Sequence, residues 1–178
     1  MYKNETDKNL IFLLSSEVDK DAWRELYEPH HLLLYRFLLR FLNGNEGQAE
    51  DITQDVFLKI YDKAGQYNSK FAFTTWLFNM AMNQAKNEWK KSNRTTAGEV
   101  PETPCEVTPE DLLDADLKRK KIDELLLQLS TEHRETYILR YQQGFSTREV
   151  AEVLEISEGT VKSRLFKATQ LITKYFKK

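Results

Sequence analysis

The side chains best suited to chemistry on a nucleic acid gather in residues 70–94, which read KFAFTTWLFNMAMNQAKNEWKKSNR. The stretch begins with aromatic residues, continues with the amides Asn79, Asn83, Gln84 and Asn87, and ends in lysines and an arginine. Aromatic faces stack on unpaired bases, amides hydrogen-bond the edges of a flipped base, and basic groups hold the phosphate backbone. The order of these groups therefore predicts a segment that opens a DNA duplex. Phe78 and Met80 are better explained as ordinary hydrophobic core.

A second constellation, residues 146–167, reads STREVAEVLEISEGTVKSRLFK and has helix-turn-helix form. Ser146 and Glu149 have the spacing of a capping box, and Ala151 supplies the small residue that two steeply crossing helices need. The second helix would present basic and hydroxyl side chains outward, which suits the major groove of DNA. A plain three-helix bundle without a DNA role is the alternative. Glu155 stands where the turn usually has glycine, and a left-handed conformation there costs about 1–2 kcal/mol. Either the turn tolerates that cost or its geometry differs slightly.

The charge of the chain is unevenly distributed, although its net charge of −2 argues weakly against nucleic-acid binding. No acidic residue follows Glu158, whereas six basic residues do. Residues 99–116 carry acidic side chains and no lysine or arginine. A charge run usually marks only a solvated surface, so this pattern supports DNA binding without establishing it.

Apolar residues recur at helical spacing almost throughout, so helices must position both constellations. The expected helices of the first half are Asp7–Leu14, Asp19–Glu28, His30–Leu42, Gln48–Ala64 and Phe73–Asn93, with a break at Pro29. The expected helices of the second half are Leu112–Leu129, a helix from Ser130 or Thr131 to Gln143, Ser146–Leu154 and Ser157–Phe176. Proline, threonine and glutamate replace the periodicity between Arg94 and Pro109, which predicts a linker. The expected fold is all-α, with two helical domains (1–94 and 114–178) joined by a flexible acidic linker (95–113).

Several functional classes are disfavoured. Neither a membrane span nor a signal peptide is recognisable, so a cytoplasmic protein is expected. Cys105 and the three histidines lack zinc-ligand spacing, and we expect no metal and no cofactor. No phosphate loop, nucleophile motif or catalytic residue is evident, which disfavours an enzyme. A simple helix-turn-helix regulator stays open, although no sensor domain is visible.

Three segments together resemble a known family: AEDITQDVFLKIYDK (49–63), FTTWLFNMAMNQAKNE (73–88) and LSTEHRETYILRYQQGFSTREVAEVLEISEGTVKSRLFKA (129–168). In this order, with a linker between, they resemble bacterial RNA polymerase sigma factors of the two-domain, extracytoplasmic-function subfamily. The resemblance covers about residues 20–94 and 115–176. The last segment alone is less specific, because response regulators carry similar helix-turn-helix domains.

The resemblance implies a sigma factor that binds core RNA polymerase and directs promoter recognition, melting and initiation. The residues it assigns to polymerase binding are Asp51, Gln54, Asp55 and Phe57. Those assigned to the minus-ten element are Phe71, Phe73, Trp76, Asn83 and Lys86. Those assigned to the minus-thirty-five element are Arg140, Arg148, Thr160, Lys162, Ser163, Phe166 and Lys167. Thr53 and Asp55 depart from the family pattern of an aliphatic residue and a glutamate.

The implied partners are the clamp and flap of core RNA polymerase, double- and single-stranded promoter DNA, and an anti-sigma factor. No covalent chemistry is involved. Binding to polymerase would place both DNA-reading domains at a fixed spacing, and such linkage raises the effective concentration of the second contact. The linker would run near the RNA exit path. In the free protein its carboxylates would shield the basic helices from DNA.

Overall fold

The computed structural model describes residues 5–16, 19–95 and 114–176, and within these ranges every regular element is helical. The elements of the first half are α1 (Asp7–Ser16), α2 (Lys20–Phe41), α3 (Glu46–Asp62), a short turn η1 (Ala64–Gln66) and α4 (Phe73–Thr95). Those of the second half are α5 (Asp114–Leu127), α6 (Thr131–Tyr137) with its π-helical continuation η2 (Ile138–Gln142), α7 (Thr147–Leu154) and α8 (Glu158–Phe176). The all-helical prediction is confirmed, whereas nearly all of the expected linker lies outside the described residues.

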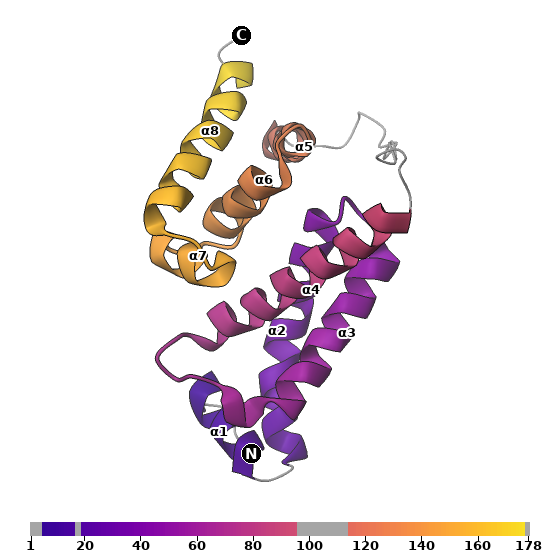
Figure 1. The fold of residues 1–178 in the computed structure, drawn as a ribbon, viewed down its shortest axis with the longest axis vertical. Helices are drawn as coiled ribbons and strands as arrows, with labels where there is room; N and C mark the ends of the chain where they lie inside the picture. Colours follow the sequence, from indigo (N-terminus) through magenta and orange to yellow (C-terminus); the bar gives the residue numbers. More distant parts are fainter. Residues whose placement is uncertain (1–4, 17–18, 96–113, 177–178) are drawn as a thin grey trace.

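Helices α1 to α4 pack around a shared apolar interior (Figure 1). Ile52, Val56 and Ile60 recur at four-residue spacing on α3, and each is at most 2% exposed. This stripe faces the interior, so the polar residues between its members are turned to the surface. The Asn45 side chain accepts the amide of Gln48 at 3.1 Å and starts α3.

The expected break at Pro29 is wrong, because α2 runs through it as one helix of 22 residues. Proline has no amide hydrogen, so the carbonyl of Glu25 loses its helical partner. Pro29 lies on the exposed side of α2, where water can replace that donor. Leu26 and Leu34 are fully buried on either side of it. The packing of this apolar stripe therefore holds the helix together across the proline.

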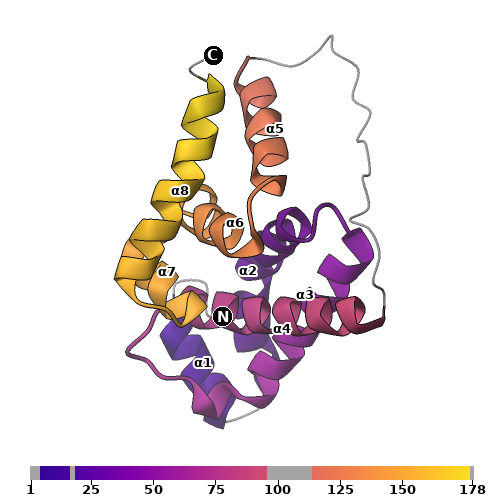
Figure 2. The same cartoon turned by 45° about the horizontal axis from the view of Figure 1, so that its top comes forward.

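Helices α6, α7 and α8 form the second helical group, and α5 lies against α8 (Figure 2). Val150, Leu154, Val161 and Leu165 are buried between α7 and α8, as the helix-turn-helix prediction requires. Gly144 has φ +79°, a conformation that costs glycine little, and this ends the preceding helix. The capping box at Ser146 then starts α7.

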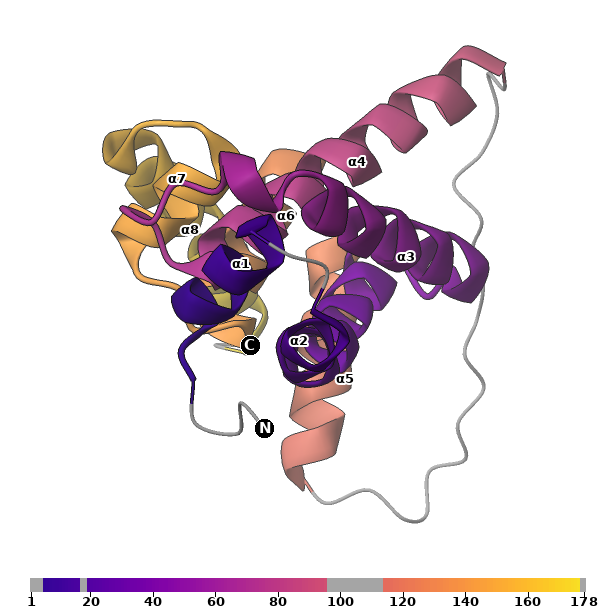
Figure 3. The same cartoon turned by 90° about the horizontal axis from the view of Figure 1, so that it is seen from below.

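The two helical groups touch along α4, which lies between α3 and α7 (Figures 1 and 3). Phe78 of α4 and Phe145, which precedes α7, bring their rings to 5.0 Å between centroids in an edge-on contact. Both side chains are buried. The apolar interior is therefore continuous from one group to the other.

Candidate nucleic-acid interface

The outer surface of α3 carries the polar residues that were predicted to bind a protein. Asp51, Gln54 and Asp55 are all exposed, and Leu58, one turn further along, is 63% exposed. Residues at this spacing share one face of a helix. Leu58 therefore adds one exposed apolar side chain to this polar face.

A groove between α3 and α4 extends this polar face. Its lining residues are Gln48, Asp51, Ile52, Gln54, Asp55, Gln84 and Glu88. Gln84 of α4 donates a hydrogen bond to Asp55 Oδ2 at 3.2 Å, and the Lys59 ammonium donates to Gln84 Oε1. The sequence pattern grouped Gln84 with amides that could read bases. The structure instead places it beside Asp55, whose orientation it restricts.

Two aromatic candidates lie in the protein interior. Phe57 and Phe73 are each 2% exposed. Phe57 packs edge-on against Trp23 and Tyr27, and Phe73 packs against His30 at 4.9 Å. Direct contact of either ring with a partner would require it to leave the interior. Both rings are better explained as supports for the surface residues around them.

The remaining aromatic candidates are Phe71, in the loop before α4, and Trp76, on the first turn of α4. Phe71 is 38% exposed, and its carbonyl accepts a hydrogen bond from the Tyr67 hydroxyl at 2.7 Å. Trp76 is half-buried, with its ring 5.2 Å from that of Tyr67. Tyr67 was not predicted as a site residue, yet it fixes the backbone of one aromatic candidate and packs against the other. No sequence motif distinguishes it from other loop tyrosines.

Further along α4, the polar candidates are Asn83 and Lys86. Asn83 is exposed and donates to Asn79 Oδ1 at 3.3 Å. Lys86 is half-buried, and its ammonium lies 3.2 Å from Oε2 of Glu135 on α6. Asn83 is therefore open to a nucleic acid, whereas Lys86 is engaged by the second helical group.

The helix-turn-helix has the predicted capping box at Ser146 and a strained turn at Glu155. Ser157 Oγ accepts the amide of Thr160 at 3.1 Å at the start of α8. Glu155 adopts φ 56° and ψ 43°, so of the two alternatives the turn keeps the left-handed conformation. This conformation costs a residue with a side chain about 1–2 kcal/mol compared with the right-handed region.

The outer face of α8 gathers the predicted minus-thirty-five candidates. Lys162, Ser163, Phe166 and Lys167 are exposed, and the Phe166 side chain is 67% exposed. Thr160 is half-buried near the N-terminus of the helix, where backbone amides can meet a phosphate. This face combines positive charge, hydroxyls and one apolar ring, which is the chemistry of major-groove contact.

The two remaining arginine candidates lie on neighbouring elements. Arg148 of α7 is exposed and pairs with Glu152 at 3.0 Å. Arg140 donates to the carbonyl of Phe145 at 3.2 Å, and its guanidinium lies 5.7 Å from the Tyr141 ring centroid. Arg148 is free to turn toward a phosphate at little cost, since exposed ion pairs are weak. Arg140 already has a local structural role.

The capping box of α7 gives a stability prediction. The Ser146 amide donates to Glu149 Oε2 at 2.8 Å, and the Glu149 amide donates to Ser146 Oγ at 3.2 Å. We expect Ser146→Ala to lower the free energy of unfolding by about 1 kcal/mol. Urea unfolding followed by circular dichroism measures this, with exposed Ser163→Ala as the control. An unchanged midpoint would contradict it.

The same cap makes stability depend on pH. Hydrogen bonds from Ser146, first from its side chain and then from its backbone, lower the pKa of the Glu149 carboxyl. The cap therefore stabilises the fold above the ordinary pKa of a glutamate. This contribution is lost as the pH falls through the lowered folded-state pKa. Glu149→Gln should remove that part of the acid dependence, whereas Glu152→Gln on the same helix should retain it.

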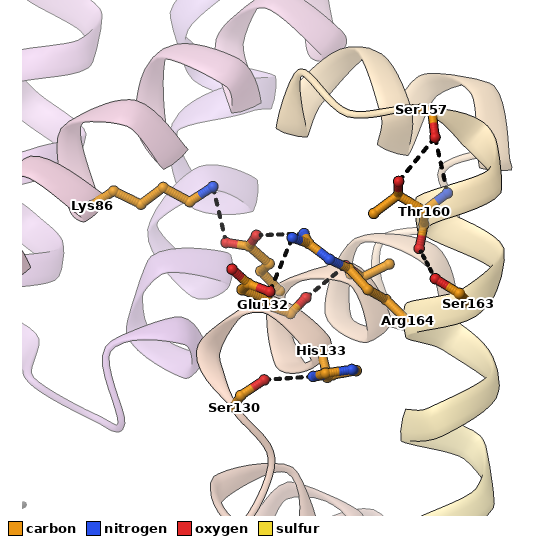
Figure 4. A network of polar contacts seen from close by, with 10 residues as sticks. Lys86, Ser130, Glu132, His133, Ser157, Thr160, Ser163 and Arg164 are labelled. Atoms are coloured by element: carbon orange, nitrogen blue, oxygen red, sulfur yellow. Dashed lines mark hydrogen bonds and ion pairs between the residues drawn. The ribbon is translucent and has the colours of Figure 1, made fainter.

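An ion-pair network connects α4, α6 and α8 (Figure 4). The Arg164 guanidinium lies 3.1 Å from Glu132 Oε2 and 3.4 Å from Glu135 Oε1, while Lys86 approaches Glu135 from α4. The Glu135 side chain is 2% exposed. Burial raises the pKa of its carboxyl, and the two cations oppose that rise. The buried Glu135 carboxylate thus links α4 of the first helical group to α8 of the second.

Two family models match the chain. The model described as Sigma-70 region 2 matches residues 26–95, and the one described as Sigma-70, region 4 matches residues 119–172. These ranges contain the α3–α4 surface and the helix-turn-helix, respectively.

Similar proteins and structures agree with these matches. The chain is 37% identical to ECF RNA polymerase sigma factor SigL of Mycobacterium tuberculosis over 84% of this chain and 85% of the relative. It is 27% identical to ECF RNA polymerase sigma factor SigW of Bacillus subtilis, over 88% of this chain and 89% of the relative. Among solved structures, sigma factor RpoE in complex with the anti-sigma factor NepR, from Bartonella quintana, has a TM-score of 0.74 at 23% identity, over 89% of this chain and 98% of that chain. The structure of CnrH in complex with the cytosolic domain of CnrY has a TM-score of 0.72 at 21% identity, over 97% of this chain and 98% of that chain.

Proposed function

Because the chain belongs to the extracytoplasmic-function (ECF) family of RNA polymerase sigma factors, we propose that it binds core RNA polymerase and directs promoter recognition, DNA melting and transcription initiation. One observation carries this proposal most directly. A polar docking face on α3 lies next to an aromatic-to-basic α4, and a separate recognition helix, α8, presents exposed basic residues. A helix-turn-helix regulator would need only the last of these.

The docking face consists of Asp51, Gln54 and Asp55, which we assign to the polymerase clamp. Leu58 would add an apolar contact at the end of that face. The second helical group would rest on the polymerase flap. The family matches at 26–95 and 119–172 support a division into a core-binding and melting domain (1–94), a linker (95–113) and a minus-thirty-five domain (114–178).

Promoter DNA would be read at two places. Phe71, Trp76, Asn83 and Lys86 are our candidates for the minus-ten element, with Phe73 supporting them from the interior. The α8 side chains Lys162, Ser163, Phe166 and Lys167 would meet the minus-thirty-five element, and Thr160 with Arg148 would contact its phosphates. Each surface alone would bind weakly, and attachment to one polymerase makes the two contacts act together.

We also propose an anti-sigma factor as a partner, because both solved structures named above are complexes with a second protein, and in one of them that protein is called an anti-sigma factor. In the described part of the chain, no helix is both long and apolar enough to span a membrane. Since its relatives are transcription factors, we place the protein in the cytoplasm. No catalytic activity is part of the proposal.

Reconstitution with core polymerase tests the function. The purified chain, added to core enzyme on a library of promoter fragments, should yield run-off transcripts from a defined subset. Core enzyme alone should not. If no fragment supports transcription and the chain does not comigrate with core enzyme on a sizing column, the proposed function is wrong.

Gln84 should strengthen polymerase binding by orienting Asp55. Gln84→Ala removes the hydrogen bond that orients Asp55, and one such bond is worth about 1 kcal/mol, or about fivefold in affinity. Competition binding to core polymerase measures the loss. Asn87→Ala, an exposed amide on the same helix, should leave binding unchanged. Equal affinity of Gln84→Ala and the parent would contradict the positioning role.

A further inference from the structure

The first turn of α1 lies against the segment that leads into α4. Helix α1 contacts η1, and two views show it beside the chain that follows η1 (Figures 2 and 3). The Lys8 ammonium donates a hydrogen bond to the carbonyl oxygen of Ser69 at 2.7 Å, across 61 positions of the sequence. We call residues 67–72 the Phe71 loop, after the exposed aromatic side chain that it presents. One end of α1 is therefore attached to the backbone of this loop.

The Ser69 carbonyl belongs to a tight turn within the Phe71 loop. The Phe71 amide donates to the carbonyl of Asn68 at 3.1 Å, and the Lys70 amide donates to Asn68 Oδ1, also at 3.1 Å. A turn closed by a bond between its first and fourth residues does not use the carbonyl of its second residue. Lys8 binds that carbonyl from outside. Because its donor is charged, this bond is stronger than one between neutral groups.

Asp7, the neighbour of Lys8, acts on the two ends of the loop. Its Oδ2 lies 3.1 Å from Nε2 of His30, whose ring packs at 4.9 Å on Phe73, the first residue of α4. Burial, and after it the Asp7 charge, raises the pKa of the Tyr67 hydroxyl. Asp7 therefore acts directly on the residue that begins the loop, and through His30 on the residue that follows it.

The position of the Phe71 ring depends on these backbone contacts. The ring is 38% exposed, so packing against the interior holds it only in part. The Tyr67 hydroxyl holds the Phe71 carbonyl from within the loop, and Lys8 holds the turn from α1. A loop with so few attachments loses its position when one of them is removed, while the helices on either side of it stay packed.

We propose that Lys8 and Asp7 are positioning residues that set how strictly the Phe71 loop discriminates between unpaired bases of the minus-ten element. A flipped base is read by stacking and by hydrogen bonds to its edge, so the surrounding groups have to be in place before it arrives. A loop that is not held has to be ordered when the preferred base binds, which weakens that binding. A disfavoured base makes fewer of these contacts and loses less. This inference rests on the proposed role of the loop in promoter recognition.

The test uses polymerase holoenzyme made with the full-length chain and a set of promoter fragments. The fragments carry each of the four bases at the minus-ten position where the parent discriminates most strongly. Lys8→Met keeps most of the apolar stem and removes the hydrogen-bond donor. Its affinity for the preferred fragment should fall about fivefold, as for the loss of one hydrogen bond, and its affinity for the others should change by less than about twofold.

Two lysine variants are matched controls. Lys8→Arg keeps a charged donor near the Ser69 carbonyl and should retain most of the discrimination. Lys20→Met removes an exposed lysine at the start of α2 and should leave discrimination unchanged. If Lys8 instead touched a DNA phosphate, Lys8→Met would weaken binding of all the fragments equally and lower its salt dependence. That result, or unchanged discrimination, overturns the inference.

Amide hydrogen exchange in the free chain follows the loop itself. Lys8→Met should speed exchange of the Phe71 and Lys70 amides, which the turn protects, and leave the amides of α3 unchanged. Asp7→Asn is a second variant and should act in the same direction on both exchange and discrimination. Unchanged exchange in the loop overturns the inference. Faster exchange throughout α3 also overturns it, because α1 would then support the whole helical group and not the loop.

The outcomes distinguish this inference from the proposed function. If holoenzyme made with the parent chain transcribes none of the fragments, the proposed function fails and the inference falls with it. If the parent transcribes and discriminates, and both Lys8→Met and Asp7→Asn discriminate equally well, the inference alone fails.

Discussion

Simultaneous replacement of Asp51 and Asp55 by alanine is expected to weaken binding to core polymerase by about 100-fold or more. Both carboxylates are exposed on one face of α3, and truncating one member of a buried charge pair at an interface costs about 2–5 kcal/mol. Part of each loss comes from the polymerase cation that is left unpaired. Run-off transcription should fall in parallel, and a large excess of the variant should restore part of it.

Asp62→Ala is the matched control for this experiment. Asp62 is an exposed aspartate at the end of the same helix, two turns beyond Asp55. Competition with a labelled parent chain for core polymerase measures both variants in one assay. If the double variant competes as well as Asp62→Ala, the assignment of this face to polymerase is wrong. Because both aspartates are solvent-exposed, neither change should lower the melting temperature appreciably.

The second large effect is expected on the recognition helix. Lys162→Ala/Phe166→Ala/Lys167→Ala removes two exposed cations and the 67%-exposed ring from the outer face of α8. Each contact to DNA is worth about 1–3 kcal/mol, so promoter binding by the holoenzyme should fall by at least about 100-fold. The loss of the two lysines should also reduce the salt dependence of binding, by about one unit of slope for each phosphate contact.

Lys174→Ala provides the control, since Lys174 is exposed two turns beyond Lys167, near the end of α8. Footprinting at several salt concentrations yields both affinity and slope. If the triple variant binds the promoter as tightly as the parent, the minus-thirty-five element must be recognised by another surface. A loss of affinity without a change in slope would mean that Phe166 alone contributes and that the lysines stay in solvent.

Local patterns predicted the helices and their ends well, because caps and turns depend on neighbours in sequence. The capping box of Ser146 with Glu149 occurs as expected. Pro29 shows the limit of this approach. A proline usually ends a helix, but apolar packing before and after it overrides that tendency. Such packing depends on α1, α3 and α4, which all lie against α2, and not on residues next to the proline in sequence.

The candidate site was less predictable than the fold. Spacing indicates that Asp51 and Asp55 share a face with Gln54, and they are exposed as expected. Spacing alone does not indicate whether an aromatic residue near that face is exposed. Phe57 was predicted to contact polymerase, but the structure shows that its side chain is buried. The pairing of Gln84 with Asp55 joins residues 29 positions apart, and that of Arg134 with Asn43 joins residues 91 apart. Contacts of this kind arise only from the packing of whole helices.

The Lys86–Glu135 ion pair also has a consequence for binding measurements on this chain. A DNA phosphate that takes Lys86 as its partner has to break this pair and leave the buried Glu135 carboxylate with Arg164 alone. The apparent free energy of DNA binding would therefore include the free energy of that exchange, and it would be smaller than the strength of the new contact suggests.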